Sequence, residues 1–201
     1  MGPGAAPVVG CGDEVISPRQ VFLFSGHMID VPGRTPSRFP PALVPAAAQA
    51  LAGVLDAHAA GPADVAIAQA ASGGDLLFLE ACLDRGVRVW VMLPFAAPDF
   101  IERSVLPAQD GKAWRARFEA VMARLPAPPR IMPADDMAGD SPYERCNRWM
   151  LDTAQAWGAD RLCFICLWDG GGGDGPGGTA SMCTEVERRG GRFDWIDIRK
   201  L

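Results

Sequence analysis

A glycine-rich stretch between Trp168 and Thr179 is the feature of this chain best suited to chemistry. It follows the apolar run 162–167 and precedes a helical pattern at 180–189. A strand, a glycine turn and a helix start bring free backbone N–H groups and the positive end of a helix dipole to one point, where phosphate and other anions bind. Thr179 is expected to cap the helix. The residues predicted to hold the anion are Gly175, Gly177, Gly178 and Thr179. The alternative interpretation is a solvent-exposed loop.

A second glycine turn, formed by Ser72, Gly73, Gly74 and Asp75, also lies between a strand-like and a helical run. Its backbone is suited to a phosphate or a ribose, with Asp75 or Ser72 bonding a sugar hydroxyl. In the alternative interpretation Asp75 only caps the helix and the glycines permit a tight turn. Neither turn has the GxGxxG or GxxxxGK[ST] pattern, so a Walker-type ATPase is unsupported.

Further candidates for ligand contact follow other strand-like runs. They are Ser25, Gly26 and His27 after the first run, Pro94 and Phe95 after the third, and Trp168. A histidine at a strand end can act as an acid, a base or a hydrogen-bond donor. The rings of Phe95 and Trp168 can stack on a nucleobase. The other histidine, His58, is interpreted as a surface residue of an alanine-rich helix, so no metal site is predicted.

Carboxylates matter because a glycosidic reaction needs one near the sugar to stabilise an oxocarbenium-like centre. Glu80 and Glu185 lie inside the helices that follow the two glycine turns and are the catalytic candidates, beside Asp169 and Asp174. The alternative is that each glutamate is a solvated helix residue. Arginines are suited to phosphate. Those available are Arg145 and Arg148, or Arg34 and Arg38.

The composition is typical of one globular α/β domain: 201 residues, 49% hydrophobic and 21% charged. A net charge of −5 argues against a general binder of nucleic acid or anionic membranes. No apolar run approaches the roughly 20 residues that span a bilayer. We expect a disordered leader over 1–20 and one domain over 21–201. The N-terminus lacks the pattern of a secretion signal, so we expect a cytosolic location.

The six cysteines show no disulfide framework. Cys163 and Cys166 are three residues apart on a predicted strand, where their side chains face opposite sides of the sheet. Buried, reduced thiols are therefore predicted rather than a metal or redox pair.

Strand-like and helical runs alternate along the chain. The expected strands are 21–26, 64–69, 87–93, a short edge strand at 130–132, 161–168 and 193–197. The expected helices are 40–60, 75–85, 98–105, 112–125, 141–157 and 180–189. Continuous apolar strands separated by helices predict a Rossmann-like three-layer α/β/α sandwich with a mostly parallel sheet. Ligands of such sheets lie beyond the carboxyl ends of the strands, where these loops fall.

The chain resembles the SLOG superfamily of Rossmann-like domains, which includes the Smf/DprA proteins and the LOG phosphoribohydrolases. The resemblance covers roughly 21–198 and rests on Ser72-Gly73-Gly74-Asp75 before a helix, Leu93-Pro94, and the late Pro176-Gly177-Gly178-Thr179 with Glu185. The similarity is greatest to a bacterial branch often attached to tetratricopeptide or signalling modules. In the LOG signature, threonine lies three residues before the glutamate; here Thr179 lies six residues before Glu185.

The resemblance implies binding of a nucleotide or a nucleotide-derived signal. The leading hypothesis is therefore a nucleotide-binding or sensing domain that needs no cofactor, with neither nucleic acid nor a membrane as partner. The rival is an N-glycosidase that releases the base from a nucleoside 5′-monophosphate. A purely structural module, a homodimer and attachment to signalling modules are left open.

Overall fold

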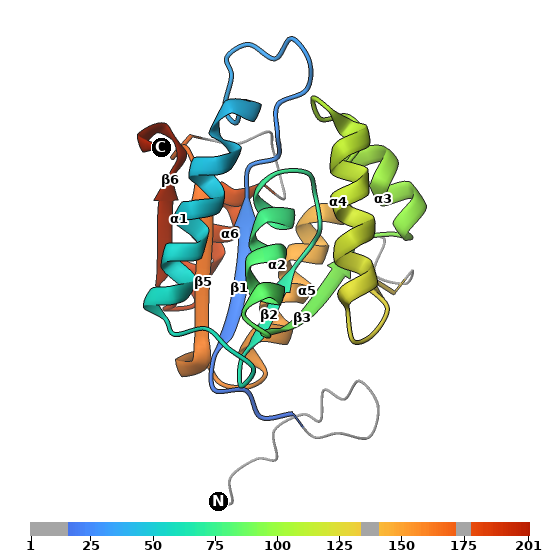
Figure 1. Ribbon diagram of the computed structural model, residues 1–201. Helices are drawn as coiled ribbons and strands as arrows, with labels where there is room; N and C mark the ends of the chain where they lie inside the picture. Colours follow the sequence, from blue (N-terminus) through green and yellow to red (C-terminus); the bar gives the residue numbers. More distant parts are fainter. Residues whose placement is uncertain (1–15, 134–140, 172–177) are drawn as a thin grey trace, which may run out of the picture.

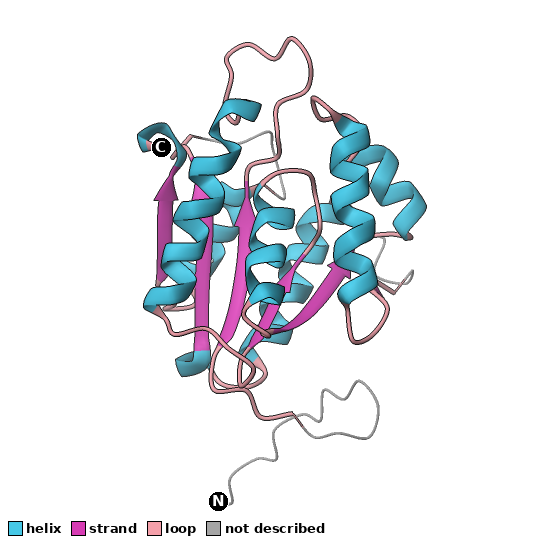
Figure 2. Ribbon diagram, viewed as in Figure 1, coloured by secondary structure: helices cyan, strands magenta, loops and turns pink. Residues whose placement is uncertain are grey.

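The computed structural model describes residues 16–133, 141–171 and 178–201. In this part of the chain all strands form one parallel sheet in the order β4-β3-β2-β1-β5-β6 (Figures 1 and 2). The strands are β1 (Val21–Gly26), β2 (Val65–Ala68), β3 (Arg88–Leu93), β4 (Arg130–Ile131), β5 (Leu162–Trp168) and β6 (Phe193–Asp197). The predicted α/β class with a parallel sheet is confirmed.

Helices cover both faces of the sheet. They are α1 (Val44–Ala57), α2 (Gly74–Asp84), α3 (Ala97–Ser104), α4 (Gly111–Arg124), α5 (Pro142–Gln155) and α6 (Thr179–Arg188), with short 3-10 turns at Pro41–Leu43, Ala159–Arg161 and Ile198–Lys200. The helices α1 to α4 lie on one side, and α5 and α6 lie behind the sheet in Figure 1. The three-layer arrangement agrees with a Rossmann-like fold.

The central strand β1 shows why the sheet must be covered twice. Phe22 and Phe24 pack into the core under α1 and α2, whereas Val21 and Leu23 pack into the core against α5 and α6. Apolar residues at successive positions therefore bury both faces, as expected for a parallel strand. Phe24 stacks on Phe78 of α2, with ring centroids 4.7 Å apart.

The outer strand β4 is short because its flanking prolines cannot donate ladder hydrogen bonds. It pairs with the end of β3, Met92 opposite Arg130, and lies at the edge of the sheet as predicted. The next helix, α5, has Ser141 at its N-cap and Pro142 at its first position, which agrees with the preference of proline for helix starts.

Residues 16–20 belong to the fold, although the leader was expected to reach Gln20. Arg19 donates two hydrogen bonds to the buried carboxylate of Asp64, Nε to Oδ1 at 3.0 Å and Nη2 to Oδ2 at 2.7 Å. Trp157 Nε1 donates to the carbonyl of Ile16 at 3.2 Å. The rest of the predicted leader, 1–15, lies outside the described residues.

The structure confirms buried thiols for four of the five described cysteines, whereas Cys163 is half-buried, and Cys11 lies outside the described residues. Cys166 is buried between β5 and α6, whereas Cys163 packs against the core on the opposite face of the sheet. The two thiols diverge because residues three apart on a strand point to opposite sides. Cys82, Cys146, Cys163, Cys166 and Cys183 are all free thiols.

Candidate functional site

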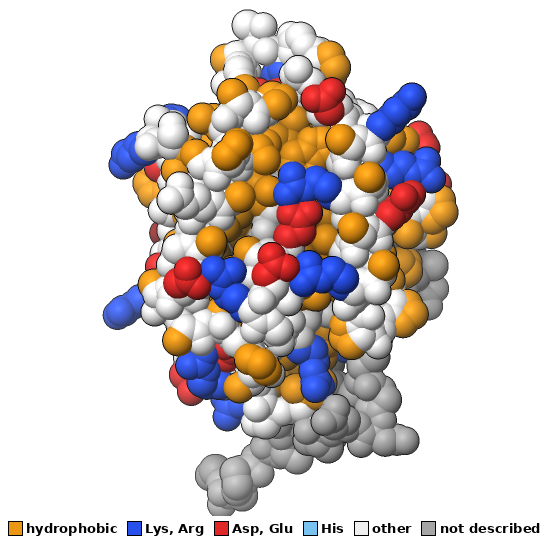
Figure 3. All heavy atoms as spheres, viewed as in Figure 1, with side chains coloured by type: hydrophobic (Ala, Val, Ile, Leu, Met, Phe, Trp, Pro, Cys, Tyr) orange, Lys and Arg blue, Asp and Glu red, His pale blue; other side chains and the backbone are white. Residues whose placement is uncertain are grey.

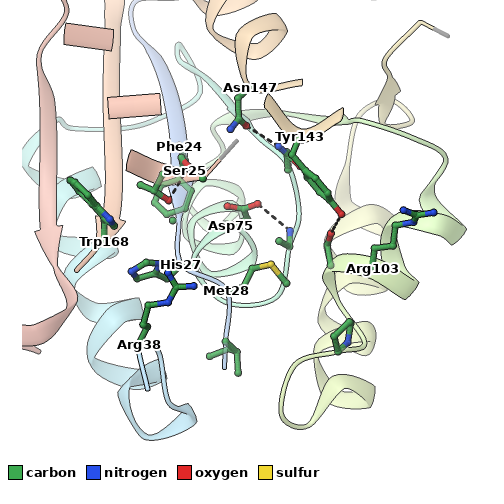
Figure 4. Close-up of a pocket in the computed structure, with 18 of the residues that line it drawn as sticks. Phe24, Ser25, His27, Met28, Arg38, Asp75, Arg103, Tyr143, Asn147 and Trp168 are labelled. Atoms are coloured by element: carbon green, nitrogen blue, oxygen red, sulfur yellow. Dashed lines mark hydrogen bonds between the residues drawn. The ribbon is translucent and has the colours of Figure 1, made fainter. Parts of the chain in front are cut away.

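A cavity of about 410 Å³ opens at the carboxyl ends of β1 and β5. Its walls come from the β1–α1 connection, the starts of α2 and α6, the end of α3 and the first turns of α5 (Figure 4). The carboxyl edge of a parallel sheet is the usual ligand position in such folds. Of the sequence-predicted ligand residues, those lining it are Ser25, Gly26, His27, Asp75, Trp168, Gly178 and Thr179.

The start of α6 lines one wall of the cavity through Gly178 and Thr179. The prediction that Thr179 caps this helix is wrong. Gly178 is the N-cap residue, Thr179 is the first helical residue, and the cap has no side-chain hydrogen bond. Thr179 Oγ1 instead accepts a hydrogen bond from Ser25 Oγ at 3.2 Å, which ties the helix start to the end of β1. Gly175 and Gly177 lie outside the described residues.

His27 follows β1 and is buried at the cavity wall. Its Nε2 accepts a hydrogen bond from the Asp169 N–H at 3.2 Å and lies 3.1 Å from Asp169 Oδ1. Burial lowers the pKa of His27; Asp169 opposes this shift, and Arg38 and Arg34 reinforce it. Because its pKa is lowered, the imidazole is mainly neutral near pH 7.

The β1–α1 connection carries two arginines into the cavity wall, Arg34 and Arg38. Asp30 holds this connection in shape: its carboxylate accepts hydrogen bonds from Ser37 Oγ at 2.6 Å and from the backbone N–H of Arg38 and Phe39. Burial lowers the pKa of the Arg38 guanidinium, and the nearby Arg34 lowers it further. Asp30, whose Oδ1 lies 3.6 Å from Arg34 Nε, partly opposes this shift. Two guanidinium groups at one wall make this part of the cavity suitable for an anion.

Asp75 lies in the first turn of α2 and is buried at the centre of the cavity (Figure 4). Its Oδ2 accepts a hydrogen bond from the Ala71 N–H at 3.1 Å. Burial raises the pKa of Asp75 to about 7, against the opposing effect of that N–H. Beside it, Gln69 Nε2 donates to Asn147 Oδ1 at 2.9 Å. The carboxyl group can therefore gain or lose a proton near neutral pH.

The other residues of the second glycine turn do not line the cavity. Gly73 pairs with Met28 in an isolated antiparallel bridge, and the Gly74 N–H donates to the His27 carbonyl at 3.0 Å. The Ser72 carbonyl accepts from the Ile29 N–H at 3.1 Å. The turn thus joins the β2–α2 connection to the β1–α1 connection, and the N–H groups of Ser72 and Gly74 are bonded within the protein.

Two further predicted residues do not line the cavity. Pro94 is buried, and Phe95 does not line the cavity. The Phe95 ring packs edge-on against Tyr143, with centroids 5.5 Å apart, and the Arg103 guanidinium lies 5.2 Å from its centroid. Phe95 therefore supports two side chains that do reach the cavity. Trp168 lines the cavity directly.

Glu80 and Glu185, the predicted catalytic residues, are not brought to the cavity. Glu80 pairs with Arg117 of α4 on the outer helical face, where acidic and basic side chains stand side by side (Figure 3). Glu185 bonds Arg188 and Arg189, which lower its pKa to about 2. The helical phase of α2 and α6 turns both carboxylates away from the sheet edge.

The structure also assigns cavity residues that the sequence did not indicate. They are chiefly Gln69, Arg103, Ser104, Tyr143 and Asn147. The spacing of Tyr143 and Asn147, four apart on one helix face, was a usable signal because such residues are neighbours. Of the four arginines predicted as candidates for phosphate contact, Arg34 and Arg38 line the cavity, whereas Arg145 and Arg148 do not.

No protein-family model matches the chain, and no curated protein matches it. Membership of the SLOG superfamily stays a prediction. Among the described residues no helix has the length and apolar character to cross a bilayer. Within the same residues, no group of three or more His, Cys, Asp or Glu side chains is arranged to hold a metal ion.

Proposed function

We propose that this cavity binds a nucleotide or a nucleotide-derived signal. The observation that carries the proposal is the sharing of one cavity by a helix start, two arginines and a buried carboxyl group. A nucleotide combines an anion, a hydroxylated sugar and a flat base. Each of the three has a chemically matched partner in this cavity.

The phosphate is proposed to lie near Arg34, Arg38 and the start of α6. Guanidinium groups form charge-assisted hydrogen bonds with phosphate, and the helix start adds backbone N–H groups and a favourable dipole. Burial and the nearby Arg34 lower the pKa of Arg38, so an anion bound there favours the charged form of this guanidinium. Trp168 lines the same end of the cavity, whereas the aromatic ring of Tyr143 lines the opposite end, where a base can pack against it.

Calorimetric titration tests this proposal with mono-, di- and cyclic nucleotides. We expect binding by the wild type, and Arg34→Gln and Arg38→Gln to weaken it roughly tenfold or more each, because a hydrogen bond to a charged group contributes about 1.5–3 kcal/mol. Arg124→Gln is the matched control, since Arg124 pairs with Asp84 at 2.8 Å on the outer helical face. No binding at millimolar nucleotide, or full affinity in both cavity variants, would contradict the proposal.

The second candidate function is hydrolysis of the N-glycosidic bond of a nucleoside 5′-monophosphate. Asp75 favours it, because it is an acidic side chain within the cavity and its pKa of about 7 suits a general acid or base. In this reaction water adds to C1′ as the C1′–N bond breaks. The products are ribose 5-phosphate and the free base.

Chromatography of nucleotides incubated with the protein separates hydrolysis from binding alone. If hydrolysis occurs, Asp75→Asn is expected to reduce base release at least a hundredfold, because loss of a positioned acid or base costs about 10²–10⁴-fold. Glu80→Gln and Glu185→Gln serve as controls and are expected to retain activity. The hydrolytic candidate is rejected if the wild type binds a nucleotide and releases no base.

A further inference from the structure

The carboxyl group of Asp75 has one oxygen available to a ligand. Among the described residues its side chain accepts a single hydrogen bond, from the Ala71 N–H to Oδ2. The residue is only 8% exposed and lines the cavity. A buried charged acceptor is stable only when hydrogen-bond donors surround it. No described residue donates a hydrogen bond to Oδ1, so a donor group of a ligand in the cavity can satisfy this oxygen.

The position of Asp75 limits which part of a ligand supplies that donor. Arg38, His27 and Trp168 lie on one side of it, and Tyr143 and Arg103 lie on the other (Figure 4). The first side carries the proposed phosphate subsite. The second side presents the Tyr143 ring, whose hydroxyl is engaged with Ser104 Oγ at 2.8 Å. The sugar is the part of a nucleotide that lies between phosphate and base.

We infer that Asp75 binds the 2′,3′-diol of a ribonucleoside 5′-phosphate and so selects ribonucleotides over deoxyribonucleotides. The inference rests on the proposed nucleotide binding and names the class of nucleotide. A carboxylate suits a vicinal diol because it is acceptor-only, and the two lone pairs of Oδ1 can take hydrogen bonds from the two hydroxyls. Removing one hydroxyl leaves one of these acceptor sites without its donor in a buried position, and such a loss discriminates strongly between ligands.

The same placement is compatible with the hydrolytic candidate. A group bonded to the 2′-hydroxyl lies next to C1′, the atom at which the glycosidic bond breaks. Diol recognition and base release nevertheless have separate readouts, because recognition is measured by equilibrium binding without turnover.

The test compares ribonucleoside 5′-monophosphates with their 2′-deoxy and 3′-deoxy counterparts by calorimetry at pH 8, where the carboxyl group is ionised. We expect the wild type to bind the best ribonucleotide at least tenfold more tightly than either deoxy form. Asp75→Asn is expected to lose this preference while binding the deoxy forms about as well as the wild type. Asp99→Asn, at an exposed position in the first turn of α3, is the control and should keep the preference.

Three other kinds of result from these titrations would overturn the inference, and each has a different meaning. Equal affinities of the wild type for ribo and deoxy forms, or a preference that survives in Asp75→Asn, would overturn diol recognition and leave nucleotide binding intact. An equal loss of all ligands by Asp75→Asn would show that Asp75 contacts another part of the ligand. If the wild type bound no nucleotide, the proposed function would fail together with the inference. Circular dichroism of each variant establishes that it is folded.

Discussion

Asp75→Asn is expected to gain stability relative to the wild type as the pH rises. The free energy of unfolding of the variant minus that of the wild type should be about 4 kcal/mol larger at pH 8 than at pH 4. Burial raises the pKa of Asp75 to about 7 in the folded protein, whereas an unfolded aspartate titrates near about 3.9. Between these values the folded state holds a proton that the unfolded state has released. The contribution of Asp75 to the free energy of unfolding therefore falls as the pH rises from about 4 to about 7, and it stays constant above that range.

Urea unfolding of both proteins from pH 4 to pH 8 measures this effect. Asparagine carries no charge at any of these values, so the variant lacks the contribution of Asp75, and subtracting the two curves removes the other titrating groups. Asp99→Asn again serves as the control and should follow the wild-type curve. Parallel curves for the wild type and Asp75→Asn would mean that this carboxyl group is not desolvated. A stabilised variant that binds ribonucleotides poorly is the expected exchange of stability for function at a binding site.

Gly73→Ala is expected to destabilise the fold by about 3 kcal/mol or more and to abolish ligand binding. Gly73 has φ +99°, a conformation that side chains with a Cβ rarely adopt, and this strain costs about 1–3 kcal/mol. A Cβ there would also lie 2.7 Å from the Ile29 nitrogen and 2.8 Å from the His27 carbonyl oxygen. Backbone atoms cannot rotate away, so the overlap adds a further cost of about 1–3 kcal/mol. The contact between the two connections beside the cavity must then open.

Gly33→Ala is the matched control for this substitution. Gly33 also has a positive φ, +78°, but a Cβ there would meet nothing within 4 Å. The control therefore measures conformational strain alone, about 1–2 kcal/mol. Urea unfolding compares the two variants, and equal losses would indicate that the contact between Gly73 and the β1–α1 connection adds nothing to stability.

Much of the fold was predictable from the sequence because its signals are local. The apolar runs of β1, β2, β3 and β5 identify strands buried on both faces, and glycines and prolines mark where they end. Polar and glycine residues that directly follow a parallel strand must lie at its carboxyl edge. For that reason the sequence alone predicts which residues gather at one edge of the sheet. They include Ser25, His27, Asp75, Trp168 and Thr179.

The choice among chemically similar residues required the tertiary structure. Glu80 and Asp75 lie five residues apart on α2, yet only Asp75 lines the cavity, because the packing of α2 against β1 and α4 sets its rotation. Composition and spacing contain no such information. Likewise, the sequence of the turn at Gly73 suited a phosphate, whereas in the fold the Gly74 N–H and the Ser72 carbonyl bond the β1–α1 connection instead.

The far wall of the cavity depended on chain topology. Residues from different segments meet there because β3, β2, β1 and β5 are successive neighbours in the sheet. They are Gln69 after β2, Arg103 and Ser104 of α3 after β3, and Asn147 of α5 before β5. Local sequence determined which segments form strands, helices and the loops between them, since those depend on nearby side chains. Tertiary packing decided which of the loop and helix residues face one cavity, because that depends on helix rotation and strand order.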